Sequence, residues 1–280
     1  MSSYRDLAGL LQGKTDSKIL ILDSNNLQFY YQHQMLMPAT HIFAPYDLIL
    51  IPGWVYAEYS HHTGKDSYVK NDIPTTKLYI DEVNDYLPML EHSDKKLMEL
   101  FATCSTAEEA YRFFGPMKKL QVDDYPDDWI VQFYNNGFPM QQKGTLLTRK
   151  NAGEISIITL AFSLLSHFQS NIASITLASS DKGSIRLKEK VLSVANQSPL
   201  ELNIHKAPPI SFLTTEVSMF NAVKSGILDP NRISTLRPTP RSSIYVEHHA
   251  DMSSTIHDIV VDTASFINMC QNHQNYTIVY

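Results

Sequence analysis

Cysteine is scarce in this sequence. The 280 residues include only Cys104 and Cys270, which lie far apart and form no CxxC pair. A disulfide framework or a cysteine-based zinc site needs several cysteines at suitable spacings. The composition therefore argues against both as the basis of the fold.

Motifs built on glycine are also missing. None of the 10 glycines belongs to a GxxxxGK[ST] loop, a GxGxxG turn or a GxSxG elbow. These motifs carry the phosphate loop of P-loop enzymes, the dinucleotide site of Rossmann folds and the nucleophile of many serine hydrolases. Their absence disfavours P-loop nucleotide hydrolysis, a Rossmann cofactor and a serine triad.

Long apolar runs are absent as well. No stretch approaches the roughly 18 apolar residues that are needed to span a bilayer. The polar start, MSSYRDLAGLLQGKTDSK, lacks the charged and apolar regions of a signal peptide. We therefore expect a cytoplasmic protein that makes no contact with membranes.

Negative charge is in excess, but only in one region. The formal net charge is −6, and residues 61–140, with 14 acidic and 8 basic residues, account for all of it. The rest of the chain is neutral and holds basic clusters at residues 149–150 and 182–190. A local cluster attracts a polyanion more than the total charge does, so nucleic acid is an expected partner of this part. Solvated helix faces are the alternative explanation of the clusters.

Three short apolar runs have the features of buried strands. Residues 18–22, 47–51 and 174–178 are each followed by turn-forming or polar residues and then by a helical pattern. A later segment, ISIITLAFSLLSHF, is an almost wholly apolar helix that must be buried against a sheet. Strands that alternate with helices predict an α/β protein with a mainly parallel central sheet between two helical layers.

Changes of pattern divide the chain into three regions. Residues 1–60 and 144–226 form the predicted α/β core. Residues 61–143 form a predicted acidic helical insertion, and residues 227–280 a predicted C-terminal extension. Outside the three main strands, the patterns predict strands at 144–147, 202–205, 243–247 and 276–280, and helices at 77–90, 95–101, 106–114, 214–225 and near 256–269.

Four acidic residues lie at or just beyond these strand ends or near the start of helices. They are Asp23, Glu58, Glu154 and Asp181. The carboxyl ends of parallel strands meet at one edge of a sheet, so acids that are distant in sequence can become neighbours there. Carboxylate oxygens are the ligands that Mg²⁺ and Mn²⁺ prefer, and such ions activate water for phosphodiester hydrolysis. The pattern predicts a catalytic metal site made by these four acids.

The segments around these acids resemble the PIN-domain nucleases, a family that includes VapC-like toxins and several RNA-processing and RNA-decay enzymes. The matching segments are ILDSNNL, IPGWVYAEY, NAGEISIITLA and LASSDKGSIR. The resemblance implies a PIN-like three-layer core and an endoribonuclease that leaves a 5′-phosphate and a 3′-hydroxyl. It leaves open a toxin with an antitoxin or another protein partner, an RNA-processing enzyme, a homo-oligomer, and DNA in place of RNA.

Five polar residues near the acids are candidates for holding the substrate. Hydroxyl and amide groups can bind a phosphate or a metal-bound water, and basic groups can pair with the nucleic-acid backbone. The candidates are Asn25, Ser180, Lys182, Ser184 and Arg186.

Each acid also has a simpler explanation. Asp23 and Asp181 could be helix caps, Glu154 could stabilise a helix through its dipole, and Glu58 could be an exposed helix residue. Another alternative is a transition-metal site of Glu58 with His61 and His62 on one helix face. At the level of the whole protein, the alternative to a nuclease is a non-catalytic PIN-like scaffold that binds RNA or protein, with the acidic insertion as a docking region.

Overall fold

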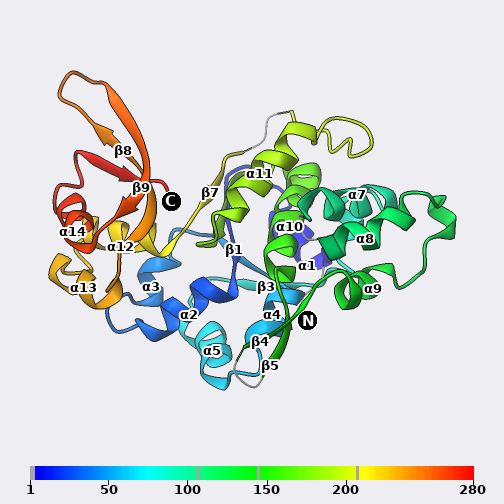
Figure 1. The fold of residues 1–280 in the computed structure, drawn as a ribbon, viewed down its shortest axis with the longest axis horizontal. Helices are drawn as coiled ribbons and strands as arrows, with labels where there is room; N and C mark the ends of the chain where they lie inside the picture. The colour runs from blue at the N-terminus through cyan, green and yellow to red at the C-terminus, as the bar shows by residue number, and fades with distance from the viewer. Residues whose placement is uncertain (1–3, 106–107, 144–145, 206–207) are drawn as a thin grey trace.

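A parallel sheet forms the centre of the protein, which is seen here in a computed structural model that describes residues 4–105, 108–143, 146–205 and 208–280 (Figure 1). The sheet has five strands in the order β3-β2-β1-β6-β7, and every neighbouring pair is parallel. The strands are β1 (Ser17–Leu22), β2 (Leu48–Pro52), β3 (Lys77–Ile80), β6 (Ile172–Ala178) and β7 (Ile210–Phe212).

Helices cover both faces of this sheet, which confirms the predicted α/β architecture with a helical layer on each side. All five residues of β2 are buried, as expected of a strand that is covered on both faces. Figure 1 shows α10 and α11 on one side of β1, and α2, α3 and α12 on the other. The helices that flank the sheet are α1 (Tyr4–Leu11), α2 (Ser24–Gln32), α3 (Ala39–Ile42), α4 (Gly53–Tyr59), α10 (Ala152–Phe168), α11 (Gly183–Val194) and α12 (Thr215–Lys224).

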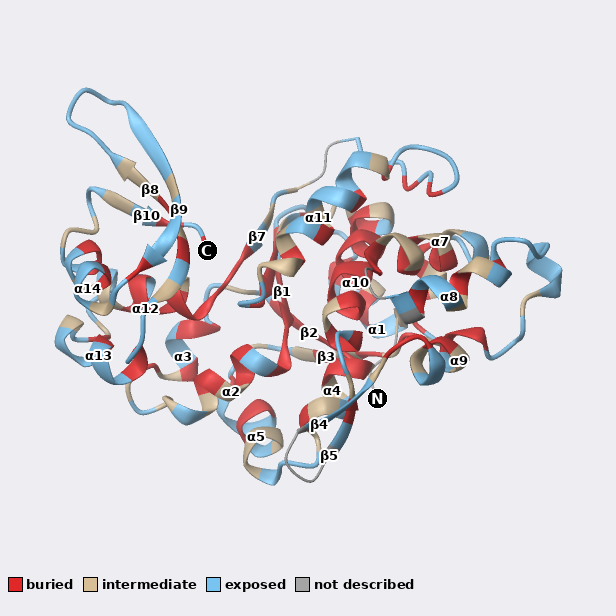
Figure 2. Ribbon diagram, in the orientation of Figure 1, coloured by how far each residue is buried: buried red, intermediate tan, exposed pale blue. Residues whose placement is uncertain are grey.

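The predicted apolar helix is α10, and it forms the centre of one helical layer. It packs on β1, β2 and β6, and all but three of its 17 residues are buried (Figure 2). Glu154 is one of those three. On the other face, the hydroxyls of Tyr30 and Ser218 lie 2.7 Å apart and join α2 to α12. No helix in the described part of the chain has the length and apolar character needed to cross a bilayer.

A mainly helical region follows α4. Its aromatic side chains pack on the core: Trp54 of α4 stacks on Phe101 at 5.3 Å between ring centroids, and Phe101 packs on Phe133 at 5.5 Å. The region contains α5 (Thr63–Ser67), η1 (Tyr68–Asp72), α6 (Tyr86–Met89), α7 (Asp94–Cys104), α8 (Glu108–Met117), η2 (Val122–Asp124), α9 (Trp129–Asn136), β4 (Met140–Lys143) and β5 (Leu146–Arg149).

The helix predicted at 77–90 is wrong over its first residues. These residues form β3, an edge strand of the central sheet whose Leu78 pairs with Leu50 of β2. Burial alternates along β3, because successive side chains point to opposite faces of the sheet and one face is covered more fully than the other. The predicted insertion therefore contains one strand of the core sheet.

Other predicted elements have mixed outcomes. The helices at 95–101 and 214–225 are confirmed as parts of α7 and α12, and α8 covers the described part of the one at 106–114. The strand at 144–147 falls partly on residues outside the described ones, and its described part lies in β5.

The strand predicted at 202–205 is wrong. Glu201 and Asn203 have positive φ angles, and the side chain of Asn196 takes up both backbone groups of Ile204. The fifth strand is formed later in the chain, by β7.

The last part of the chain forms a second, antiparallel sheet, called the small sheet below. Its strand order is β10-β8-β9, with β8 (Arg241–His248), β9 (Ser254–Val261) and β10 (Tyr276–Ile278). The strand predicted at 243–247 is confirmed in β8, and β10 confirms the first three residues of the strand predicted at 276–280. The predicted helix near 256–269 begins only with α14 (Thr263–Gln271). The first half of that segment forms part of β9 instead. The short helices η3 (Pro230–Arg232) and α13 (Ile233–Leu236) lead into the small sheet.

Candidate metal and nucleic-acid site

The strand order creates a crevice at the carboxyl edge of the large sheet. From β1 the chain runs outward to β2 and β3, and it later returns to place β6 on the other side of β1. Such a change of direction opens a crevice between the two adjacent strand ends, where open α/β sheets bind their ligands. Asp23 directly follows β1, and Asp181 lies three residues beyond β6.

All four predicted acids line one cavity at this edge. Glu58 reaches it from α4 and Glu154 from the first turn of α10. The cavity has a volume of about 250 Å³, and its lining residues are Asp23, Asn25, Glu58, Gln141, Lys150, Asn151, Glu154, Ser179 and Asp181. Four segments of the chain thus contribute one acid each to a common space.

Glu154 and Asp181 are the most closely coupled of these acids. A Cβ atom on Gly183 would lie 2.9 Å from Oε1 of Glu154 and 3.1 Å from Oδ1 of Asp181, so both carboxylates border the same point. Burial raises the pKa of Glu154 to about 7, the charge of Asp181 adds to the effect, and the hydrogen bond from Ser184 opposes it. A bound cation would offset this repulsion between the carboxylates.

Glu58 is held by its neighbours rather than exposed. The hydroxyl of Ser24 donates a hydrogen bond of 2.5 Å to its Oε2, and a Cβ atom on Gly153 would lie 2.7 Å from its Oε1. Glycine at position 153 therefore lets α4 and α10 approach closely enough for Glu58 and Glu154 to share the cavity. The explanation of Glu58 as an exposed helix residue is wrong, because the side chain is partly buried.

The helix-cap explanation holds for one of the two aspartates. Asp23 occupies the N-cap position of α2, but its side chain makes no cap hydrogen bond, and only 7% of the residue is exposed. Asp181 does accept a hydrogen bond of 2.8 Å from the backbone N–H of Gly183 at the start of α11. Asp181 thus caps a helix and lines the cavity, whereas capping does not explain Asp23.

The present side-chain positions do not form a finished coordination shell. Within the described residues, no three His, Cys, Asp or Glu side chains are arranged to hold a metal ion. One oxygen each of Glu58, Glu154 and Asp181 accepts a hydrogen bond from the protein instead. The donor set of four carboxylates suits Mg²⁺ or Mn²⁺, but these side chains would have to turn before their oxygens could approach one ion to roughly 2.0–2.6 Å.

Two of the five predicted substrate-binding residues belong to the site. Asn25 lines the cavity directly. Ser184 is buried beside it and donates a hydrogen bond of 3.0 Å to Oε1 of Glu154. Ser184 therefore orients a carboxylate rather than facing the open space.

The other three residues lie around the cavity without lining it. The hydroxyl of Ser180 accepts a hydrogen bond of 3.1 Å from the backbone N–H of Thr215 and so ties β6 to the start of α12. Lys182 forms an ion pair of 2.5 Å with Asp258 of the small sheet. Arg186 is exposed on α11.

Several lining residues were not predicted as site residues. Gln141 and Lys150 come from the β4–β5 hairpin, and Asn151 and Ser179 adjoin the predicted acids. The basic pair at 149–150 gave a signal for Lys150. Gln141 had none, because only the antiparallel pairing of β4 with β5 brings it to the cavity.

The proposed transition-metal site does not form. The helix α4 ends at Tyr59, before His61 and His62, so these histidines do not share a helix face with Glu58. The Nδ1 atom of His62 instead accepts a hydrogen bond from the backbone N–H of Lys65 and caps α5.

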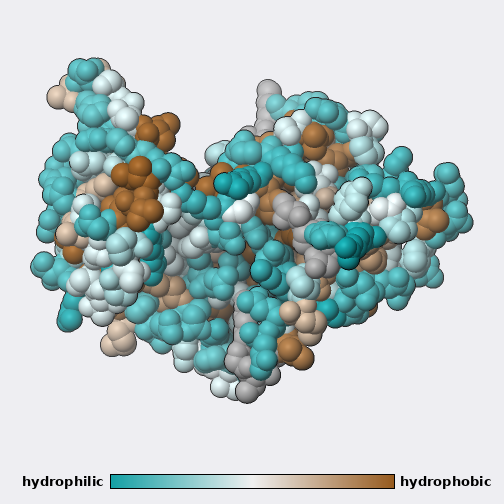
Figure 3. All heavy atoms as spheres, in the orientation of Figure 1, coloured by the Kyte–Doolittle hydropathy of each residue, from teal (hydrophilic) through white to brown (hydrophobic). Residues whose placement is uncertain are grey.

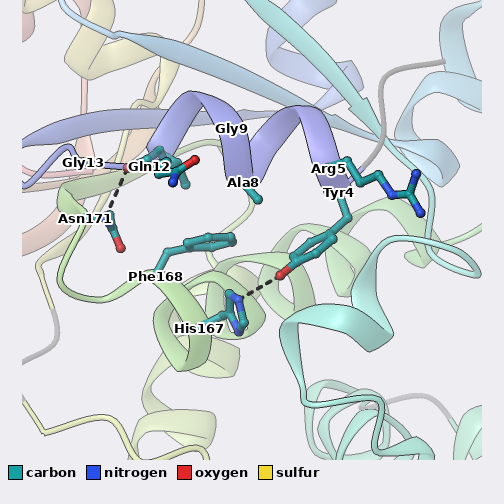
Figure 4. A pocket seen from close by; sticks show the side chains of 10 residues that line it. Tyr4, Arg5, Ala8, Gly9, Gln12, Gly13, His167, Phe168 and Asn171 are labelled. Carbon is teal, nitrogen blue, oxygen red and sulfur yellow. Dashed lines mark hydrogen bonds between the residues drawn. The ribbon is translucent and has the colours of Figure 1, made fainter.

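A larger cavity, of about 570 Å³, lies at the opposite end of α10 (Figure 4). The hydroxyl of Tyr4 and Nε2 of His167 are 2.9 Å apart there, beside the ring of Phe168. Burial lowers the pKa of His167 and favours the neutral imidazole. None of the described residues that line this cavity carries a carboxylate, so these residues do not offer the donor set found at the sheet edge.

Comparison of the chain with family models, with curated proteins and with solved structures finds no match. Any assignment of function therefore depends on the geometry and chemistry of the acidic cavity.

Proposed function

We propose that this protein is a metal-dependent endoribonuclease that hydrolyses phosphodiester bonds to leave a 5′-phosphate and a 3′-hydroxyl. Asp23, Glu58, Glu154 and Asp181 would hold Mg²⁺ or Mn²⁺. When bound, the ion supplies activation of a water molecule and neutralises charge on the leaving oxygen. The observation that carries the proposal is that four carboxylates from separate segments line one cavity at the crevice of a parallel sheet.

The other residues of the cavity have roles that suit this chemistry. Ser24 and Ser184 orient Glu58 and Glu154 through hydrogen bonds. Lys150 offers a cation and Asn25 an amide at the cavity wall, and both groups can bind phosphate oxygens. The same groups suit RNA and DNA. The resemblance to PIN-domain nucleases, in a toxin-type or an RNA-processing role, favours RNA.

The proposal is tested by measuring cleavage of a panel of single-stranded and structured RNAs in Mn²⁺ or Mg²⁺. Asp23→Asn and Asp181→Asn should each lower the cleavage rate at least ~10³-fold, because each removes a charged ligand from the metal site. Thermal unfolding should show that both variants remain folded. Asp251→Asn, at an exposed acid beyond β8, is the matched control and should leave cleavage unchanged.

The second candidate is a non-catalytic scaffold. It is favoured by the hydrogen bonds from the protein that already engage one oxygen each of Glu58, Glu154 and Asp181. Absence of cleavage across the RNA panel, together with no heat of Mn²⁺ binding in a calorimetric titration, would favour the scaffold over the nuclease.

A further inference from the structure

Tyr280 carries a buried hydroxyl group that has no hydrogen-bond partner. The residue is 3% exposed, and its hydroxyl is one of the few buried polar atoms in the described residues that bond to nothing. Leaving such a group unpaired is unfavourable, because folding removes its hydrogen bonds to water and gives none in return. An orphan donor of this kind is often explained by a ligand or ion that binds next to it.

The backbone at Tyr280 is fixed to the small sheet. Its N–H donates to the carbonyl of Ile244 at 3.0 Å, and its own carbonyl accepts from the N–H of Ile244 at 2.8 Å. The backbone position of Tyr280 is therefore set by its pairing with β8. Figure 1 shows this end of the chain in the space between the small sheet and β7.

The ring of Tyr280 packs at the same sheet edge as the acids. It meets the ring of Phe212, the last residue of β7, at 5.5 Å and an interplanar angle of 71°. Phe212 pairs with Leu177 of β6, two residues before Ser179 in the cavity wall. Tyr280 is not one of the residues that line the cavity, but this packing places it beside the cavity wall on the β7 side.

The electrostatic environment of the hydroxyl agrees with this position. Burial raises the pKa of Tyr280, and the charges of Asp181, Glu154 and Asp23 add to the shift, in that order. The phenol therefore keeps its proton at neutral pH and can act only as a neutral hydrogen-bond partner, not as a base.

We propose that Tyr280 is a substrate-binding residue of the acidic site, and that its hydroxyl donates a hydrogen bond to a phosphate oxygen of the bound nucleic acid. This role rests on the proposed nuclease function. A neutral donor suits this position, because it binds a phosphate oxygen without adding charge among the carboxylates. The small sheet would then complete a site whose metal ligands all come from the large sheet and its helices.

The test compares Tyr280→Phe with wild type and with Tyr68→Phe. Phenylalanine keeps the contact with Phe212 and loses only the hydroxyl. Tyr68 is a matched control, since its hydroxyl is also buried and unpaired but lies in η1, where Asp72 is its charged neighbour. Three quantities are measured for each protein: kcat/KM for a fluorogenic single-stranded RNA in Mn²⁺, the Mn²⁺ affinity by calorimetry, and the melting temperature.

We expect Tyr280→Phe to lower kcat/KM about tenfold or more, as for the loss of a hydrogen bond to a charged group. Its Mn²⁺ affinity and melting temperature should match those of wild type, and Tyr68→Phe should cleave normally. If Tyr280→Phe cleaves as well as wild type, or if its Mn²⁺ affinity falls in step with cleavage, the phosphate-binding role is overturned. If wild-type protein cleaves no RNA, the nuclease proposal itself fails and the role of Tyr280 fails with it.

Discussion

The large sheet and the small sheet contribute to this protein in different ways. The large sheet is parallel and covered on both faces, so its central strands are largely buried and the candidate ligand side chains lie where the strands end. The small sheet is antiparallel and only partly covered. Its edge strand β9 leaves Ile256 and Val260 72% and 67% exposed, and Figure 3 shows apolar surface on this lobe and a hollow beside it.

The two sheets meet at the acidic cavity through a few polar contacts. The large sheet and its helices supply all four carboxylates. The small sheet supplies Asp258, which pairs with Lys182, and it holds Tyr280, whose ring packs on Phe212 beside the cavity wall. The large sheet thus provides the candidate metal ligands, and the small sheet provides groups beside them. Four predictions, in order of decreasing effect, test that division.

The largest effect should come from Arg237, which holds the small sheet to the core. Its side chain is fully buried. It donates a hydrogen bond of 2.8 Å to the carbonyl of Val261 and lies 3.5 Å from the carboxylate of Glu216 on α12. Arg237→Met should lower the free energy of unfolding by about 3 kcal/mol, because it leaves Glu216 buried with weaker pairing. Chemical denaturation measures this loss. Arg232→Met, at an exposed arginine of η3, should leave the free energy of unfolding almost unchanged. Equal stability of both variants would show that Arg237 does not hold the small sheet to the core.

The next effect concerns the close approach of α4 and α10. In Gly153→Ala, the new Cβ atom would lie only 2.7 Å from Oε1 of Glu58, so the Glu58 side chain must move. We expect Mn²⁺ affinity and RNA cleavage to fall about tenfold, or about 1.4 kcal/mol. Calorimetry and cleavage assays measure both. Gly115→Ala in α8, where a Cβ atom meets nothing within 4 Å, should leave both unchanged. Normal Mn²⁺ binding by Gly153→Ala would show that Glu58 is not a ligand of the metal site.

A buried acid of the large sheet that lies outside the cavity can be compared with the four acids that line it. Glu82 follows β3, and burial raises its pKa to about 8 against partial opposition from hydrogen bonds with Ser156 and Trp54. The folded state therefore binds this proton more tightly than the unfolded state. The stabilisation of the folded state by this bound proton is complete below about pH 4.5 and is lost as the pH rises through about 8.

Glu82→Gln removes this titration while keeping an oxygen that can accept both hydrogen bonds. Between pH 5 and 8, wild-type stability should carry a component that falls by up to about 1.4 kcal/mol per pH unit, and the variant should lack it. Urea denaturation at several pH values gives the difference. Parallel pH profiles for the two proteins would contradict a protonated Glu82 in the folded state.

The smallest effect concerns the ion pair between the sheets. Exposed pairs such as that of Lys182 with Asp258 contribute about 0–1 kcal/mol to stability. If Lys182 binds the nucleic-acid backbone as predicted, Asp258→Asn should release it and raise kcat/KM for RNA about twofold to fivefold, whereas Lys182→Met should lower it. Asp251→Asn, on the same hairpin, is the control. Equal cleavage by all three variants would assign Lys182 to the sheet contact alone.

Predictions from sequence succeeded where a local pattern fixes the structure. The runs at 18–22, 47–51 and 174–178 are strands of the large sheet because buried parallel strands need continuous apolar residues. They failed at 77–80 and 202–205. The first is an amphipathic edge strand whose β conformation comes from pairing with β2, and the second is held irregular by the side chain of Asn196.

The acidic site shows the same limit. The sequence indicated the four acids, because each stands next to a strand end or in the helix that follows. It did not indicate Gln141 or Tyr280, since a hairpin and a second sheet bring them to the cavity edge from distant parts of the chain. It also could not show that Lys182 points to the small sheet, because its partner Asp258 is 76 residues away in the chain.

Local periodicity and short-range chain chemistry were enough to predict the α/β class, the buried strands of the large sheet and the four candidate carboxylates. That the four carboxylates share one cavity, which side chains orient them and what the small sheet adds beside them became visible only in the folded protein. Those features depend on strand order and on contacts between residues that are far apart along the chain, and no local pattern encodes them.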